Sequence, residues 1–339
     1  MKQIYDTDAL LRAVVLEEPI VAGPSGSVFH ARLLGHAATK RRCIVKLPPM
    51  RRMAPRLVCP ISLSAALDGL VSGGLRAEAH NALTALNAPD ASSSSSSAES
   101  QKRALKRWQA QPGYTHLHPA VHFDARIPML ISLGADGTIA ELRERLDAQT
   151  SPGPVWMRIA WQVSEAMAFL FDKVELAHVD IQPKHVLFLR YGDHKRRLHC
   201  WLSDYGDLCP VDGTADVFER GEDAYKPHAR PAGARHREHS LFAYYATLLD
   251  LFRFRVDDDD EEKEETHITD AGHSVSGFLS LLEDGTSDLM DRLEHNAQHP
   301  LVQMVLRPLR GPLSQCETHF YETMRPWLEQ TLRTGLSPI

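Results

Sequence analysis

The chain has 339 residues, 43% of them hydrophobic, and a formal net charge of −6. This length and composition predict a folded globular protein, as one two-lobed domain or two smaller ones, and exclude a fibrous or disordered chain. The negative balance gives no global basic field for nucleic acid, and no apolar run approaches the roughly 18 residues of a membrane span.

The cysteines and the N-terminus bear on the cellular compartment. The five cysteines have no C-x-x-C pair among them: Cys43, Cys59, Cys200, Cys209 and Cys316. This scatter predicts reduced thiols in the cytoplasm or nucleus rather than a disulfide framework or a zinc site. The first residues lack a long apolar core, so we expect no secretory signal.

The first third of the chain is predicted to be rich in strands. An amphipathic stretch at residues 10–16 should end at the two acids and the proline that follow it. Strands are predicted at residues 20–22, 27–33, 43–47, 118–123 and 128–133. Alternation places Cys43, Val45 and Leu47 on one face and Lys46 on the other, where a lysine points to solvent or to an anion.

Two insertions are predicted within this part. Residues 48–74 are irregular and rich in proline and arginine, and the loop at 90–112 contains six consecutive serines, which cannot bury themselves. Between the insertions, residues 75–86 have the composition of a helix and carry Glu78.

After a turn at residues 134–137 the pattern is mostly helical. Helices are predicted at residues 139–146, 155–173 and 240–254, and several more before residue 339. A hairpin is expected from strands at 186–189 and 198–202, with a basic tip at 194–197. Residues 207–237 show no clear element, and the acidic run at 257–265 is predicted to be a solvated loop.

Three groups of residues carry candidate chemistry. Gly23 and Gly26 lie in a hairpin ahead of the strand-borne Lys46. Asp180 follows His178 in His178-Val179-Asp180 and precedes a turn and an apolar strand, and Asp204 opens the tight turn Asp204-Tyr205-Gly206. Phosphoryl transfer requires phosphate cradling, charge neutralisation and orientation of the acceptor hydroxyl, and these residue types can supply all three.

The order of these motifs, a lysine followed by H-x-D and then by D-aromatic-G, resembles that of the protein kinases. The resemblance extends over residues 20–254. The glycine-loop pattern G-x-G-x-x-G-x-V is matched at Gly23, Gly26 and Val28, while Val21 stands at the first glycine. The resemblance implies an α+β, bilobal protein kinase-like fold. A small β-rich N-lobe would cover residues 1–133 with both insertions, and a larger helical C-lobe residues 134–339 with the acidic loop, together forming one kinase-like domain.

The resemblance also implies a role for each matched residue. Lys46 and Asp180 would be catalytic, with Lys46 pairing the α/β-phosphates of ATP and Asp180 accepting the proton of the acceptor hydroxyl. Asp204 would hold magnesium, or manganese. The implied nucleotide-binding set, which includes the gatekeeper and hinge positions, is Val21, Gly23, Gly26, Val28, Lys46, Glu78, Ile131 and Leu133.

Four positions depart from the family pattern. Val179 replaces the H-R-D arginine, so a switch by activation-loop phosphate is not expected. Gln182 replaces a lysine, and His185 replaces the asparagine that holds the second magnesium. Imidazole suits magnesium poorly, so we expect His185 to orient Asp180 by a hydrogen bond or to favour manganese as a metal ligand. Glu238 stands in for the aspartate that opens the following helix.

These residues favour an ATP-dependent Ser/Thr protein kinase that acts on a protein substrate. The losses at 179, 182 and 185 keep open a pseudokinase that serves as a binding or scaffold module. A third alternative is a small-molecule phosphotransferase of the aminoglycoside-kinase kind, and a Glu78–Lys46 contact would favour the protein kinase over it. The divergence and the insertions suggest a large DNA virus or a bacterial effector, which would place the protein in the cytoplasm or nucleus of a host cell, among host-cell proteins.

Overall fold

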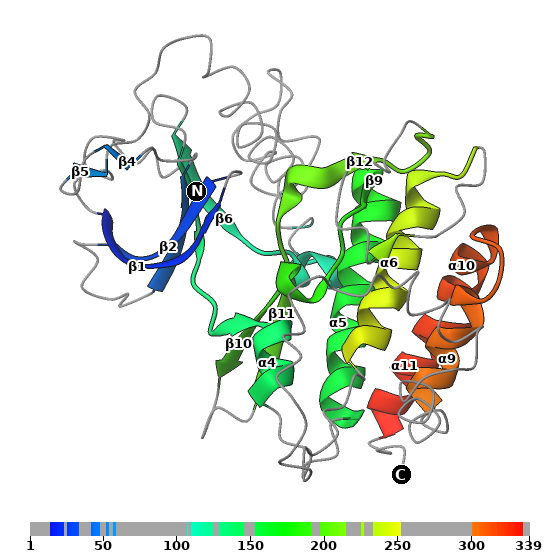
Figure 1. Cartoon of the computed structure of the whole chain (residues 1–339). Coiled ribbons are helices and arrows are strands. Elements are labelled where there is room, and N and C mark those ends of the chain that lie inside the picture. Colours follow the sequence, from blue (N-terminus) through cyan, green and yellow to red (C-terminus); the bar gives the residue numbers. More distant parts are fainter. Residues whose placement is uncertain are drawn as a thin grey trace, which may run out of the picture. The chain divides into compact units, whose positions relative to one another are not determined.

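The computed structural model combines helices with antiparallel sheets, and its elements fall into two compact units (Figure 1). The first unit is Met1–Asp136 with Leu187–Leu208, and the second is Gly137–Val186 with Cys209–Ile339. The structure describes residues 14–23, 26–33, 42–47, 52–53, 57–58, 107, 110–124, 129–145, 153–191, 197–214, 225–226, 233–251 and 300–334. The predicted bilobal kinase-like fold, with lobes at 1–133 and 134–339, stays a prediction.

A five-stranded antiparallel sheet dominates the first unit, in the order β1-β2-β3-β7-β6. Its strands are β1 (Val14–Gly23), β2 (Gly26–Leu33), β3 (Arg42–Leu47), β6 (Ala120–Asp124) and β7 (Met129–Leu133). Four of the five predicted strands match within two residues at each end. The exception is β1, which begins six residues before the predicted strand at 20–22.

The prediction that the stretch at residues 10–16 ends at Glu17, Glu18 and Pro19 is wrong, because β1 continues through all three residues. The ladder with β2 shifts register on either side of Pro19 instead. Proline lacks the N–H that a central strand needs, but an edge strand or a bulge tolerates it. β1 is an outer strand of this sheet, so the proline fits there.

Strand β3 shows the alternation that the sequence predicts. Cys43, Val45 and Leu47 are buried, whereas Ile44 and Lys46 are only half-buried. Val45 pairs with Phe29 of β2 and Ile131 of β7, which fixes the register of the sheet centre. The face opposite the core therefore carries Lys46.

The first unit is completed by segments from further along the chain. They are a 3-10 turn at Pro112–His116 and the neighbouring strands β10 (Val186–Tyr191) and β11 (Arg197–Leu202), the predicted hairpin. A parallel bridge joins Leu117 to Leu202, and the His118 N–H donates to the Leu202 carbonyl at 2.9 Å. These bonds hold the end of β11, just before Asp204, against the start of β6.

Helices make up most of the second unit. They are α4 (Ile139–Arg145), α5 (Gly153–Phe169) with a π turn at Leu170–Val174, α6 (His236–Leu251), α9 (Pro300–Leu309), α10 (Ser314–His319) with a π turn at Phe320–Met324, and α11 (Arg325–Thr334). The predicted long buried helix is confirmed, since Trp156, Ile159, Ala160, Val163, Met167 and Leu170 are all at most 3% exposed. Short strands β9 (Leu176–His178) and β12 (Leu208–Pro210) pair with each other. β12 lies where no element was predicted.

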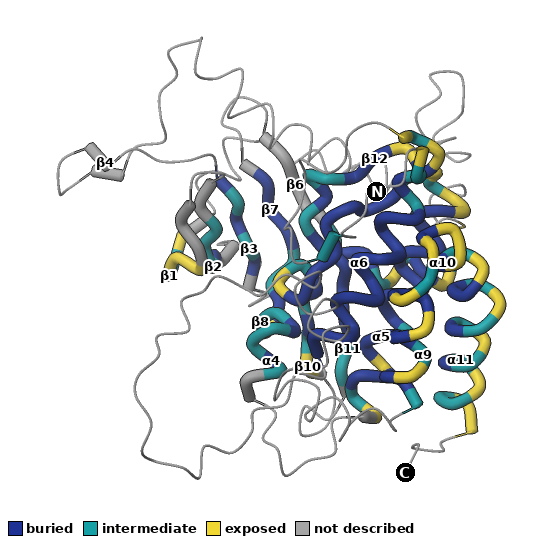
Figure 2. Tube along the Cα trace, turned by 45° about the vertical axis from the view of Figure 1, so that its right-hand side comes forward, coloured by how far each residue is buried: buried dark blue, intermediate teal, exposed yellow. Residues whose placement is uncertain are grey.

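Helix α6 is buried on nearly all sides, as its dark blue colour in Figure 2 shows. It contacts α5, α9, α10 and β9, and the Tyr244 hydroxyl donates to the Ala160 carbonyl of α5 at 2.9 Å. It begins at His236, four residues before the predicted start, because Glu238 accepts the backbone N–H of Arg235 at 3.0 Å and so caps the first turn.

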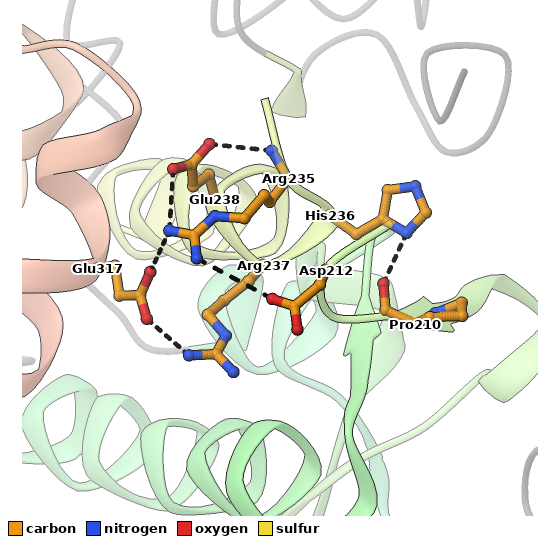
Figure 3. A network of polar contacts seen from close by, with 7 residues as sticks. All are labelled: Pro210, Asp212, Arg235, His236, Arg237, Glu238 and Glu317. Atoms are coloured by element: carbon orange, nitrogen blue, oxygen red, sulfur yellow. Dashed lines mark hydrogen bonds and ion pairs between the residues drawn. The ribbon is translucent and has the colours of Figure 1, made fainter. Parts of the chain in front are cut away.

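A network of charged side chains holds the start of α6 to α10 (Figure 3). Glu317 of α10 accepts from Arg235 at 2.7 Å and from Arg237 at 2.6 Å. Arg235 also reaches Glu238 at 3.3 Å, and the guanidinium of Arg237 lies 5.5 Å from the ring centre of Phe171. The N-terminal turn of α6 is therefore fixed from two sides.

Several predicted features lie outside the described residues. They are the helix at 75–86 with Glu78, the basic tip at 194–196, the acidic loop at 257–265, and most of the two insertions. Two short paired strands, β4 (Arg52–Met53) and β5 (Leu57–Val58), lie within the first insertion. None of the helices in the described ranges is long and apolar enough to cross a membrane.

Candidate active site

Lys46 and Asp204 form an ion pair although they lie 158 residues apart. The Lys46 Nζ is 3.0 Å from Asp204 Oδ1, and the two side chains are 25% and 34% exposed. Lys46 is opposite Val28 in β2 and opposite Leu130 in β7, so neighbours on both sides fix its position. Two of the residues predicted to share a site are thus in contact.

Asp204 has a backbone conformation that few residues adopt. Its φ is 62° and its ψ is 70°, in the left-handed region. Such a conformation costs about 1–3 kcal/mol for a non-glycine residue and is more common for aspartate than for most. Although Asp204 precedes a 3-10 turn at Tyr205–Asp207, its side chain makes no capping bond to that turn. The carboxylate is directed to Lys46 instead.

Tyr205 anchors the turn that carries Asp204. Its side chain is only 3% exposed, so the ring packs in the protein interior. Its hydroxyl donates to the carbonyls of His118, at 2.9 Å, and Leu202, at 3.2 Å. A phenylalanine could not form these bonds, so tyrosine adds polar anchoring to the packing.

His118 is a residue of this region that the sequence reasoning missed. It is 6% exposed, and its Nε2 lies 2.7 Å from the carbonyl of Leu133. Burial lowers the pKa of His118 to about 4, so the ring is neutral at pH 7 and its Nε2 must carry the proton. His118 therefore connects the end of β7 to the segment that receives the Tyr205 hydroxyl.

The predicted hinge residues lie at the end of β7. Ile131 is fully buried, and Leu133 is half-buried. The Leu133 N–H donates to the Pro119 carbonyl at 3.1 Å, while its own carbonyl receives His118. With the Leu133 N–H in use, an adenine contact from the hinge would have to come from a neighbouring residue.

The predicted glycine loop spans the ends of β1 and β2. Val21 is opposite Val28, and Gly23 is opposite Gly26, so the two strands close on residues 24–25, which lie outside the described residues. Glu78, the predicted partner of Lys46, also lies outside them. The Glu78–Lys46 contact that would favour a protein kinase stays a prediction.

In the second unit, Asp180 is contacted by two of the four residues that depart from the kinase pattern, Gln182 and His185. The Gln182 amide Nε2 donates to Asp180 Oδ1 at 2.7 Å. The His185 Nδ1 lies 3.3 Å from Asp180 Oδ2 and 2.8 Å from the Asp180 backbone carbonyl. Asp180 and Gln182 are 8% and 2% exposed. The hydrogen bond of His185 goes to the Asp180 backbone carbonyl, and the same ring nitrogen lies near the carboxylate, so both carboxylate oxygens have a neighbour.

Two hydroxyl groups of α6 bind the chain on either side of Asp180. Ser240 donates to the His178 carbonyl at 2.9 Å, and Thr247 donates to the Ile181 carbonyl at 3.0 Å. The sequence reasoning missed both, because it treated residues 240–254 as a plain apolar helix. The available signal was the spacing of seven residues, two helical turns, which puts these hydroxyls on one face. Glu238, the predicted counterpart of the family aspartate, caps α6 instead.

The described residues contain no group of three or more His, Cys, Asp and Glu side chains that could hold a metal ion. Asp204 offers a partly exposed carboxylate. This fits magnesium, which uses one or two protein carboxylates together with phosphate and water. His185 as a metal ligand stays a prediction, and its Nδ1 already contacts Asp180.

Comparison of the sequence with models of known protein families gave no match, and a search of curated proteins gave none either.

Proposed function

We propose that this chain is an ATP-dependent protein kinase that transfers the γ-phosphoryl group of ATP to Ser/Thr hydroxyls of a protein substrate. The observation that carries the proposal is the Lys46–Asp204 ion pair at 3.0 Å. The ammonium group of Lys46, on strand β3, is expected to bind phosphate, and the carboxylate of Asp204, on a strained turn, is expected to bind the metal. The two groups lie together.

The proposed reaction gives one role each to Lys46, Asp204 and Asp180. Lys46 would bind the phosphates of ATP, and an incoming phosphate would compete with Asp204 for the ammonium group. Asp204 would hold Mg²⁺ or Mn²⁺, which supplies charge neutralisation on the phosphates when bound. Asp180, oriented by Gln182 and His185, would accept the proton of the substrate hydroxyl.

The test is transfer of label from γ-labelled ATP to a Ser/Thr-rich protein substrate, with Mg²⁺ or Mn²⁺. We expect Asp180→Asn to lower the rate by about 10²- to 10⁴-fold, the usual contribution of a general base. Asp172→Asn is the matched control, since Asp172 accepts the Tyr321 hydroxyl at 2.7 Å outside the proposed site. The proposal fails if wild type and Asp180→Asn incorporate the same trace of phosphate.

The second candidate is a pseudokinase that binds nucleotide or a partner protein without transfer. It is favoured by the surroundings of Asp180, whose two carboxylate oxygens lie near Gln182 and His185. The discriminating result is a thermal shift with ATP that Lys46→Met abolishes, in a protein that transfers no label. Such a result would support nucleotide binding and exclude phosphoryl transfer.

A further inference from the structure

The two hydroxyls of α6 that reach the loop around Asp180 are an unusual use of helical Ser and Thr. Inside a helix these side chains commonly bond a carbonyl of their own preceding turn. Ser240 and Thr247 bond instead to carbonyls 62 and 66 residues earlier in the chain. They are 0% and 2% exposed, so the bonds form in the protein interior.

The bonded carbonyls bracket the candidate catalytic residue. His178 precedes Asp180 by two positions, and Ile181 follows it directly. Buried carbonyls require partners, so each hydroxyl satisfies a group that would otherwise be costly to bury. Contacts of α6 with β9 and with the 3-10 turn at Pro183–His185 bring the helix along the whole loop.

We infer that Ser240 and Thr247 are positioning residues for Asp180. Gln182 and His185 hold the carboxylate, while the two hydroxyls hold the backbone from which it projects. The helix is a firm support, because Tyr244 bonds it to α5 and Glu317 bonds its first turn. This inference rests on the proposed phosphoryl transfer and extends it to residues that contact no substrate.

Thr247 allows the sharper test, because valine keeps its shape and removes the hydroxyl, whereas serine keeps the hydroxyl and removes a methyl. We expect Thr247→Val to lower kcat by about tenfold to a hundredfold, the range for a misplaced catalytic group, with KM for ATP unchanged. Thr247→Ser should retain kcat even where it lowers the melting temperature. A purely structural role would make kcat follow stability in both variants.

A readout that does not need activity separates this inference from the proposed function. The His185 N–H donates to the Gln182 carbonyl at 2.9 Å, so its hydrogen exchange reports the order of the loop. Exchange should be faster in Thr247→Val and unchanged in the control Thr331→Val, whose lost hydroxyl bonds its own helix at 2.8 Å. Ser240→Ala gives the same two readouts if Thr247→Val does not fold.

The outcomes are distinct. Unchanged exchange and unchanged kcat in Thr247→Val and Ser240→Ala would overturn the positioning role and leave the kinase proposal standing. If exchange is faster in Thr247→Val but the wild type transfers no phosphate, both the proposed reaction and the positioning role in it are wrong. Ser240 and Thr247 would then only stabilise the loop.

Discussion

Asp180 is contacted by the neutral amide of Gln182, at the position where the Ser/Thr kinase pattern that the sequence resembles commonly has a lysine. The Gln182 amide donates to Asp180 Oδ1 at 2.7 Å, with both side chains buried, so the bond is sheltered from water. A lysine at this position could both bind the carboxylate and attract phosphate. Gln182 carries no charge, so we expect it to orient Asp180 while attracting phosphate less than a lysine would.

Substitutions of Gln182 test whether its amide orients Asp180. Gln182→Met preserves the length of the side chain and removes the donor, and should lower kcat by roughly tenfold or more through misplacement of Asp180. Gln182→Lys restores a donor and adds a positive charge, so its kcat should equal or exceed that of wild type. Steady-state phosphorylation of one substrate by the three proteins is the measurement. A Gln182→Met enzyme as active as wild type would show that the amide does not orient Asp180.

Individual residues show where sequence reasoning succeeds and where it stops. Lys46 and Asp204 could be placed together because a known pattern relates them. His118, Ser240 and Thr247 could not, because their partners are backbone carbonyls brought near by tertiary packing. The seven-residue spacing of Ser240 and Thr247 places both hydroxyls on one helix face, but it does not identify the carbonyls that they contact. A serine within an apolar helix looks the same in the sequence whether it bonds its own turn or a distant loop.

Among the elements, periodicity predicted those with a clear buried face. The alternation of β3 and the helical spacing in α5 both match the structure. β1 and α6 differ because their limits depend on context. Pro19 is tolerated only since β1 is the outer strand, and α6 starts early because Glu238 caps Arg235. The short strand β12 exists through its pairing with β9, which its own sequence does not signal.

The hydrogen bond between His118, just before β6, and the Leu133 carbonyl at the end of β7 should be sensitive to pH. Its pKa is lowered to about 4 by burial, from an ordinary value of 6.5, so the unfolded chain binds more protons between these values. The stability contributed by the neutral ring is complete above pH 6.5 and is lost as the pH falls towards 4. A shift of this size corresponds to about 3 kcal/mol.

The check is urea unfolding of wild type and His118→Gln at pH 7 and pH 4.5. Glutamine can still donate to the Leu133 carbonyl but does not titrate in this range, so the variant should lose less stability on acidification. Some dependence should remain, because burial and the nearby His199 also lower the pKa of His116 to about 4. Equal losses in the two proteins would mean that His118 is not the group responsible.

At the scale of the whole molecule, each unit has its own means of joining distant parts of the chain. In the first, β10 and β11 return to the segment around Leu117 and His118. In the second, Glu317 joins the C-terminal helices to the start of α6, about 80 residues earlier, through Arg235 and Arg237. The long sequence separation of these contacts explains why local sequence patterns did not predict them.

Removal of the Glu317 charge should weaken the second unit. Glu317→Gln removes the carboxylate that Arg235 and Arg237 share, although Arg235 keeps its contact with Glu238, and should lower the free energy of unfolding by about 1–2 kcal/mol, more than a typical surface pair contributes. Glu329→Gln is the matched control, because Glu329 pairs with Arg333 only four residues away in exposed surroundings. Chemical denaturation of both variants is the measurement, and equal small losses would show that the Glu317 network is not stabilising.

The proline in β1 has a consequence for colloidal behaviour. An outer strand offers hydrogen-bonding groups to any other polypeptide, and β1 also exposes Leu16 and Ile20, at 40% and 37%. Pro19 withholds one donor, and the charge of Glu17 adds repulsion between copies. A variant with threonine at residues 17–19 would have an uncharged strand edge with one more backbone donor. We expect this variant to precipitate at concentrations that the natural sequence tolerates.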